Sequence, residues 1–382
     1  MYLCDIMDLD LLDEMIEQGY VTARPHNSKP WVILNYTPKT QYEWKWNDVT
    51  LQARGLVYEI NENGNRGEVI ARPFKKFFNW DQGQGREDWH YSVPPPGPVI
   101  RMEKMDGSLG VLVVEHHLGP ITEMIATRGS FHSEQAEWAT QYYLNSLDKM
   151  IHELDYEDVF TPEEGKTYLF EIIYPGNRVV VDYGEYEGLV LIDVIDNETG
   201  KSDLQEFDDC NWPDKVARHV HLLGFDSGHA ADIPKGDEGF VYLWPERNYR
   251  VKMKSAEYIE LHRIVSNLSE KTIWEQLVNG RHVGQIKAGV PDEFHEFIDK
   301  TAQAINFATM DRVAEIYKKH DLIIAELLHK DEWTRKDFAA LATKDDDAKY
   351  MFMILDKKEI YYEVMKEMKP VTNRSLVLEE EV

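Results

Sequence analysis

The hydrophobic pattern of this 382-residue chain changes near residue 255, and this change constrains the fold more than any other feature. Before it, short apolar runs alternate with turns, which is typical of strands. After it, apolar residues recur at helical spacing, with a stop at Asn279–Gly280. The sequence therefore predicts an α+β region of mainly antiparallel sheets with flanking helices, followed by an all-helical region. We place the domain boundary at 255, which gives domains 1–255 and 256–382.

The first region is expected to contain most of the strands. One helix is predicted near Leu9–Gln18, and a second is predicted to start at Ser133, an N-cap residue, and to run to about Leu154. Short strands and turns are expected from 19 to about 80, and a connector is expected at Asp81–Pro98. The other predicted strands are Leu109–Val114, Tyr168–Tyr174, Leu189–Ile195, Gly239–Leu243 and Tyr249–Lys254, and the later helical patterns are Phe294–Tyr317, Leu322–Leu328 and Tyr350–Met368.

Composition excludes several classes of protein. The two cysteines, Cys4 and Cys210, are too few for a disulfide framework or a thiolate metal site. A formal charge of −27 argues against a surface coated with basic groups for indiscriminate nucleic-acid binding, although it does not exclude a local basic groove. No apolar stretch reaches the roughly 20 residues that a membrane-spanning helix needs, and the acidic N-terminus does not resemble a signal peptide. We therefore expect a soluble, cytoplasmic protein.

The segment Lys104–Ser108 is the candidate reactive segment. A lysine amine attacks phosphorus only when it is neutral, and because its reference pKa is about 10.4, a nucleophilic lysine needs burial or nearby cations. The strand Tyr249–Lys254 can supply cations, since alternation puts Arg250, Lys252 and Lys254 on one face. Three positive charges on one face suit an anion such as a triphosphate. Taken alone, however, this strand is more simply interpreted as a solvent-facing basic stripe.

Two carboxylates accompany these lysines. Glu171 lies in an apolar strand on the face shared by Leu169 and Ile173, so it needs a partner, and a metal ion or a ribose hydroxyl would serve. The pair Glu238–Gly239 places a carboxylate and a residue without a Cβ at a strand start, where the backbone can approach a base or sugar closely. A Glu-Gly pair before a strand is usually only a turn, so this signal is weak by itself.

The order and spacing of these segments resemble the motifs of the covalent nucleotidyltransferases. More specifically, the chain resembles ATP-dependent RNA ligases of the bacteriophage T4 RNA ligase 1 type. The resemblance covers roughly residues 50–262, and its first and last motifs are the most specific. The matching segments are Lys104–Ser108, Phe170–Glu171, Glu238–Val241 and Lys252–Ser255, together with Ala53–Glu59, Ala71–Asn79, Thr127–Ser130, Pro175–Val180 and Tyr258.

The resemblance implies a role for each matching residue. Lys104 is implied to attack the α-phosphate of ATP, with Mg²⁺ bridging the phosphates. Asp106 and Gly107 are implied to shape the turn, and Arg128 stands where lysine is expected. The implied ATP-binding residues are Arg54, Lys76, Lys252 and Lys254 for the phosphates, Glu171 and Glu238 for ribose or Mg²⁺ (the metal mostly through water), and Phe78 for stacking near the adenine, with Arg128 and Tyr258 in support.

The resemblance also implies a reaction and a partner. AMP passes from the lysine to a 5′-phosphate RNA end, and a 3′-hydroxyl end then displaces AMP and seals the strand. By analogy the substrate is a nicked tRNA, the process is RNA repair, the helical domain bears on RNA choice, and the location is the host cytoplasm if a phage encodes the chain.

Two alternatives remain open. One is a nucleotidyltransferase that joins DNA or only adenylylates ends. The Arg54 and Lys76 segments, and the lack of a recognisable OB-type barrel after residue 255, favour an RNA ligase over this alternative. The other is a non-catalytic RNA-binding module, against which the intact Lys104 and Glu171 argue.

Overall fold

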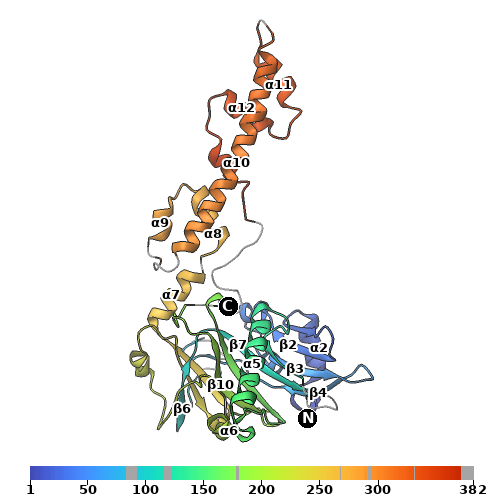
Figure 1. Cartoon of the computed structure of the whole chain (residues 1–382), viewed down its shortest axis with the longest axis vertical. Coiled ribbons are helices and arrows are strands. Elements are labelled where there is room, and N and C mark those ends of the chain that lie inside the picture. The colour runs from blue at the N-terminus through green and yellow to red at the C-terminus, as the bar shows by residue number, and fades with distance from the viewer. Residues whose placement is uncertain are drawn as a thin grey trace. The chain divides into compact units, whose positions relative to one another are not determined.

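The computed structural model describes residues 1–82, 93–115, 122–177, 180–266, 268–288, 290, 295–330 and 332–370. The chain divides into two compact units, Met1–Leu261 and His262–Glu379, whose elements Figure 1 shows. The division falls within helix α7 (Ala256–Ser266), whereas the sequence analysis placed it just before this helix. Much of the predicted connector Asp81–Pro98, and Arg178 and Val179, lie outside the described residues.

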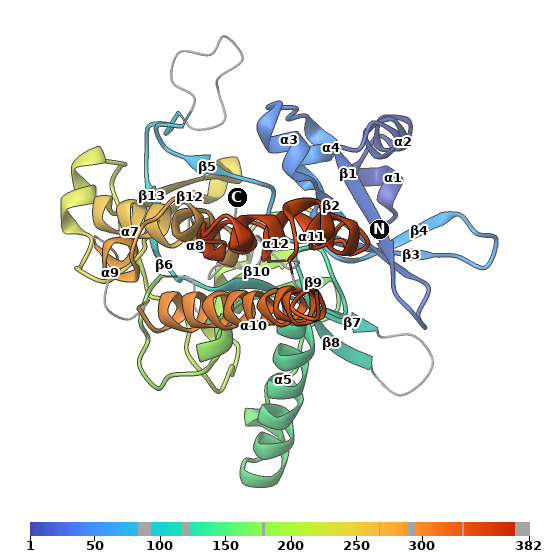
Figure 2. The ribbon, with the colours of Figure 1, turned by 90° about the horizontal axis from the view of Figure 1, so that it is seen from above.

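A four-stranded antiparallel sheet with the order β1-β2-β3-β4 opens the first unit. Two of the helices beside it begin at polar caps: the Asp8 side chain accepts hydrogen bonds at the start of α2, and the Asn47 side chain does so at the start of α4. The strands are β1 (Val21–Pro25), β2 (Trp31–Tyr36), β3 (Arg54–Ile60) and β4 (Arg66–Ala71), and Figure 2 shows beside β1 and β2 the helices α1 (Leu3–Ile6), α2 (Leu9–Glu17), α3 (Pro38–Tyr42) and α4 (Asp48–Gln52). The helix predicted near Leu9 is confirmed, but α3 and α4 fall where only strands and turns were expected.

A second antiparallel sheet, with the order β10-β9-β7-β8, packs against the first. Ile33 and Val57 of the first sheet meet Val111 and Leu169 of the second in one buried cluster. The other face is covered by α5 (Glu134–Glu153), whose predicted N-cap Ser133 accepts a hydrogen bond from the Ala136 amide. The strands are β7 (Ser108–Glu115), β8 (Thr122–Thr127), β9 (Lys166–Ile173) and β10 (Gly188–Asp196).

The third sheet has five strands in the order β11-β6-β12-β13-β5. Met102 and Leu243 of this sheet share a core with Ile172 of the second sheet. Its strands are β5 (Phe78–Asn79), β6 (Val99–Lys104), β11 (His219–Leu222), β12 (Gly239–Trp244) and β13 (Tyr249–Lys254), and the short helix α6 (Leu204–Asp209) follows β10. Since β6 belongs to the third sheet and β7 to the second, the turn 105–107 passes directly from one sheet to the other.

The second unit is built from helices in the part of the chain that the structure describes. They are α8 (Glu270–Val278), α9 (Val283–Lys287), α10 (His295–Leu327), α11 (Arg335–Ala342), α12 (Ala348–Leu355) and α13 (Tyr361–Met365). Ile316, Phe338 and Tyr350 contribute to its core. The patterns Phe294–Tyr317 and Leu322–Leu328 prove to be parts of the single helix α10.

The predicted helical segment Tyr350–Met368 is two helices rather than one. Lys357, between α12 and α13, has a φ of 57° and so lies in the left-handed region that ends a helix. The α+β class with a helical region after it is confirmed. None of the helices in the described ranges has the length and apolar character that crossing a membrane requires.

Candidate active site

Lys104 forms an ion pair at the end of β6. Strand β12 lies between β6 and β13, so Gly239 is the register partner of both Lys104 and Lys254. Glu238, which precedes Gly239, therefore lies between the two lysines, with its Oε2 2.7 Å from Lys104 Nζ and its Oε1 2.9 Å from Lys254 Nζ. The Glu238 side chain is completely buried. One carboxylate thus compensates two ammonium groups that are themselves largely removed from water.

The turn after Lys104 is anchored through Asp106. This carboxylate accepts hydrogen bonds from the amides of Val180 and Val181, at 2.8 and 2.7 Å, and from the Tyr258 hydroxyl at 2.7 Å. Burial, and then the nearby charge of Glu238, raise the pKa of Asp106 to about 6. Asp106 therefore joins the turn to a loop and to α7, which fits a structural role.

Glycine is required at position 107 because the backbone is crowded. A Cβ built there would lie 2.4 Å from the Ile172 carbonyl oxygen and 3.1 Å from Cγ of Glu171. The Gly107 amide donates a hydrogen bond of 3.0 Å to Glu171 Oε1. The buried carboxylate that the sequence analysis singled out thus contacts the backbone of the reactive turn.

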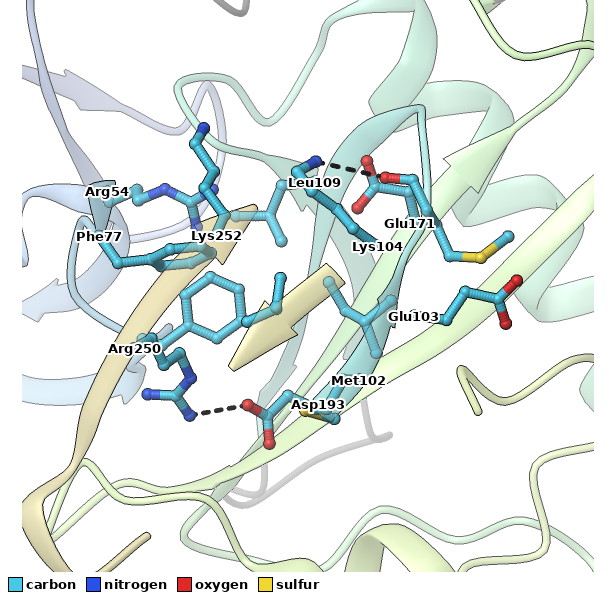
Figure 3. Close-up of a pocket in the computed structure, with 14 residues that line it drawn as sticks. Arg54, Phe77, Met102, Glu103, Lys104, Leu109, Glu171, Asp193, Arg250 and Lys252 are labelled. Atoms are coloured by element: carbon cyan, nitrogen blue, oxygen red, sulfur yellow. Dashed lines mark hydrogen bonds and ion pairs between the residues drawn. The ribbon is translucent and has the colours of Figure 1, made fainter. Parts of the chain in front are cut away.

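A pocket of about 650 Å³, which includes the solvent at its mouth, opens beside these groups. Figure 3 shows Lys104, Arg54 and Lys252 towards one end of it and the pair Asp193–Arg250 towards the other. Its lining residues are Arg54, Phe74, Phe77, Met102, Glu103, Lys104, Met105, Leu109, Glu171, Ile192, Asp193, Val241, Arg250 and Lys252. Four predicted site residues, Arg54, Lys104, Glu171 and Lys252, therefore meet in one pocket.

Phe74 and Asp193, which the sequence analysis did not assign, complete this pocket together with Arg250, which was expected to face an anion but pairs with Asp193. The Phe74 ring lies between two guanidinium groups, 4.9 Å from that of Arg54 and 5.0 Å from that of Arg250. Arg250 donates to Asp193 at 2.8 Å. Burial raises the pKa of Asp193, although Arg250 opposes this shift. An aspartate in the otherwise apolar run Leu189–Ile195 was a signal for Asp193. Phe74 lies in the matching segment Ala71–Asn79, but the sequence analysis chose Phe78 from that segment.

Lys76, Phe78 and Arg128 do not line this pocket. Lys76 Nζ and Arg128 Nη1 both donate to the hydroxyl of Tyr36, at 3.3 and 3.0 Å. Burial lowers the pKa of Lys76. The Phe78 ring is only 1% exposed and lies 5.3 Å from that of Trp46, so it packs beneath Lys76.

Tyr36 is the centre of this second cationic cluster. Burial alone would raise its pKa, but Lys76, Arg128 and Arg54 lower the pKa of Tyr36 to about 8. The sequence analysis did not single out Tyr36, because a tyrosine at the end of an apolar strand carries no distinctive pattern.

The acidic residues of this site also determine how a metal ion could bind. Across the described ranges, no three His, Cys, Asp or Glu side chains are grouped so that they could hold a metal ion by themselves. The two candidate carboxylates already have protein partners, Glu238 with Lys104 and Lys254 and Glu171 with Gly107. Any metal here would need ligands from a bound nucleotide or from water.

A family model described as "RNA ligase", of the T4 RNA ligase 1 type, matches residues 52–258, more than half of the chain. The chain therefore belongs to this RNA ligase family.

Individual relatives are more distant. The RNA ligase of Rhodothermus phage RM378 is 24% identical over 281 residues, which cover 58% of this chain and 62% of the relative. The curated relatives that match are longer proteins, of which the chain spans 34% to 62%.

Among solved structures, two RNA ligases resemble this chain at low identity. An archaeal ATP-dependent RNA ligase is 15% identical, with a TM-score of 0.42 and coverage of 81% of this chain and 79% of that one. The Naegleria gruberi RNA ligase with pyrophosphate is 11% identical, with a TM-score of 0.32 and coverage of 64% and 99%.

Proposed function

We propose that this protein is an ATP-dependent RNA ligase that works through a covalent lysyl-AMP. The observation that carries the proposal is the placement of Lys104 in a pocket shared with Arg54 and Lys252. A nucleophile and two other cations facing one cavity suit a nucleoside triphosphate, whose transfer depends on positioning and on neutralising phosphate charge. Membership of the RNA ligase family supports RNA as the substrate.

Three phosphoryl transfers follow. The neutral amine of Lys104 attacks the α-phosphorus, a nitrogen–phosphorus bond forms, and the bond to pyrophosphate breaks. A 5′-phosphate oxygen of RNA then displaces the lysine from AMP. Finally, a 3′-hydroxyl attacks the 5′-phosphate, loses its proton and releases AMP, which seals the strand.

In the free protein Glu238 is the partner of the Lys104 ammonium group. We propose that this ion pair with Glu238 keeps the Lys104 side chain in the pocket until a nucleotide binds. Loss of the ammonium proton must come before attack, and the Glu238 carboxylate lies within hydrogen-bond reach of Lys104 Nζ, at 2.7 Å, where it can accept this proton.

The other predicted site residues have different roles in this proposal. Arg54 and Lys252 neutralise phosphate charge from the pocket wall, and Lys254 assists through Glu238. Lys76 and Arg128, held around Tyr36, extend this positive surface beyond the pocket. Glu171 positions the turn and is available to a ribose hydroxyl, whereas Phe78 supports Lys76 rather than the adenine.

Mg²⁺ is the proposed metal. It would supply charge neutralisation on the phosphates. Glu171, which lines the pocket, and Glu238, which pairs with Lys104, are the carboxylates that would hold it through water. The wider setting, repair of a nicked tRNA in the cytoplasm with RNA selected by the helical unit, is proposed from the family resemblance.

The test is the intact mass of the protein after incubation with ATP and Mg²⁺, using protein first stripped of resident AMP. We expect wild type to gain one AMP and Lys104→Ala to gain none, because the proposal assigns the bond to AMP to the Lys104 amine. Lys149→Ala, which removes an exposed lysine from α5, is the matched control and should gain AMP like wild type. Adduct formation in Lys104→Ala, or none in wild type, would contradict the proposal.

A further inference from the structure

The buried ion pair at the far end of the pocket has no role in the proposed phosphoryl transfers. Asp193 and Arg250 are 1% and 6% exposed, and both line the pocket. Apolar residues, including Met102, Ile192 and Val241, line the same pocket. Burying two charges where hydrophobic side chains would fit costs free energy of folding. A role in recognising a ligand would explain why this pair is present.

The pocket has two chemically different ends. Lys104, Arg54 and Lys252 lie at one end, and Figure 3 shows the pair Asp193–Arg250 at the other, with apolar side chains between them. A nucleotide has the same order of parts, with phosphates at one end, a flat apolar base face, and a polar base edge at the other end. If the phosphates meet Lys104, the base edge is directed towards Asp193.

The hydrogen bonds of Asp193 indicate what this end can recognise. Its Oδ2 accepts from Arg250 Nη2 at 2.8 Å and from Ser202 Oγ at 2.9 Å. Its Oδ1 accepts from the Val194 amide at 3.0 Å, the single donor to this atom within the described ranges. A carboxylate oxygen has two lone pairs, so Oδ1 can accept one more hydrogen bond.

Purine chemistry supplies the matching donor. The purine edge farthest from the sugar carries position 6, where adenine has an amino group and hypoxanthine and guanine have a carbonyl oxygen. An amino group donates to a carboxylate, whereas a carbonyl oxygen is repelled by it. Resting on the proposed function, we propose that Asp193, held by Arg250, determines nucleobase specificity by accepting a hydrogen bond from the 6-amino group of adenine.

Equilibrium binding of nucleoside monophosphates tests this without any chemistry. Wild type should bind AMP roughly tenfold more tightly than purine riboside 5′-monophosphate, which lacks only the amino group, because a hydrogen bond to a charged group is lost. Inosine 5′-monophosphate should bind at least as weakly as the purine riboside compound. Equal affinity for AMP and purine riboside monophosphate would overturn the proposal, and this measurement requires no variant.

Asp193→Asn provides the second arm. Arg250 and Ser202 both donate to Oδ2, so the amide oxygen should stay there and the NH₂ group should replace Oδ1, with loss of the hydrogen bond from the Val194 amide. The accepting atom becomes a donor, and the AMP-to-IMP affinity ratio should fall at least about tenfold. A merely structural role would weaken both nucleotides equally and leave the ratio unchanged, which would also overturn the proposal.

Asp203→Asn is the matched control, because Asp203 caps α6 and pairs with Lys166 outside the pocket. Its AMP-to-IMP ratio should equal that of wild type, and a change as large as that of Asp193→Asn would contradict the assignment. The test of nucleobase specificity and the test of lysyl-AMP formation can have different outcomes. A wild type that discriminates among monophosphates but forms no adduct with ATP keeps Asp193 as the base reader and removes the ligase mechanism.

Discussion

At the scale of single residues, Tyr36 shows how several cations act on one group. Its phenol is 2% exposed and accepts hydrogen bonds from Lys76 and Arg128. The surrounding charges favour the phenolate more strongly than burial opposes it. The cluster can therefore carry a negative charge before any substrate phosphate arrives.

This gives a prediction for pH. A phenolate absorbance change with a midpoint near pH 8 should appear in wild type and be missing in Tyr36→Phe, because the pKa of Tyr36 is about 8. Since this pKa lies below its unfolded value, the stability it contributes is fully present above about pH 10 and is lost as pH falls through about 8.

Chemical denaturation checks the same prediction. The unfolding free energy of wild type relative to Tyr36→Phe should rise with pH between 7 and 10, by up to about 3 kcal/mol. Bound ATP should move the spectroscopic midpoint upward, since phosphate charges compete for the same cations. A difference between the two proteins that does not vary with pH would refute the assignment.

The sequence singled out individual residues where their chemistry is unusual for their position. For this reason the sequence analysis selected Glu171, which lies in an apolar strand, and the lysine pair Lys252 and Lys254. Asp193 carried the same signal as Glu171 but was not selected, because its partner Arg250 is 57 residues away in the chain. Tyr36 could not be selected, since its importance comes entirely from its neighbours in space.

At the scale of elements, the turn between β6 and β7 couples two sheets. Its backbone passes so close to β9 that a side chain at Gly107 would collide with the Ile172 carbonyl. Any displacement of this turn moves Lys104, the last residue of β6, relative to Glu238 at the start of β12. The position of the nucleophile therefore depends on packing between sheets.

We therefore expect Gly107→Ala to destabilise the protein by about 1–3 kcal/mol and to slow adduct formation at least about tenfold, because the backbone must shift to admit the methyl group. Denaturant titration and the rate of AMP incorporation measure these effects. Gly224→Ala is the control, since a Cβ there lies no closer than 3.8 Å to another atom. Wild-type rates in Gly107→Ala would show that the turn tolerates displacement.

Element boundaries were less predictable than element types. The helix α10 runs unbroken for 33 residues, although the sequence pattern suggested a break between Tyr317 and Leu322. Conversely, Lys357 interrupts the segment that was expected to be one helix. Packing in the second unit decided both cases, because local helix propensity is a weak preference that tertiary contacts override.

At the scale of the whole molecule, every lining residue of the pocket belongs to the unit Met1–Leu261. Adduct formation needs only ATP, metal and this pocket, whereas strand joining also needs RNA to be held. Removal of the second unit is therefore expected to reduce strand joining more than adduct formation.

A protein of residues 1–261 should keep lysyl-AMP formation within about tenfold of the full chain and lose a larger share of RNA joining, because compact units with their own cores commonly fold alone. Intact mass and joining of 5′-phosphate RNA measure the two activities, with a cooperative melting transition as the control for folding. A folded truncated protein that forms no adduct would show that the pocket depends on the second unit.

The sequence by itself determined the α+β and helical regions, the position of Lys104 and the family, because hydrophobic periodicity and short motifs are local properties of the chain. Only the tertiary structure decided that Glu238 lies between Lys104 and Lys254, that Asp193 pairs with Arg250 at one end of the pocket, and that Lys76 contacts Tyr36 instead of lining the pocket. These contacts join strands far apart in the chain. The register of three packed sheets brings them together, and no local pattern encodes that register.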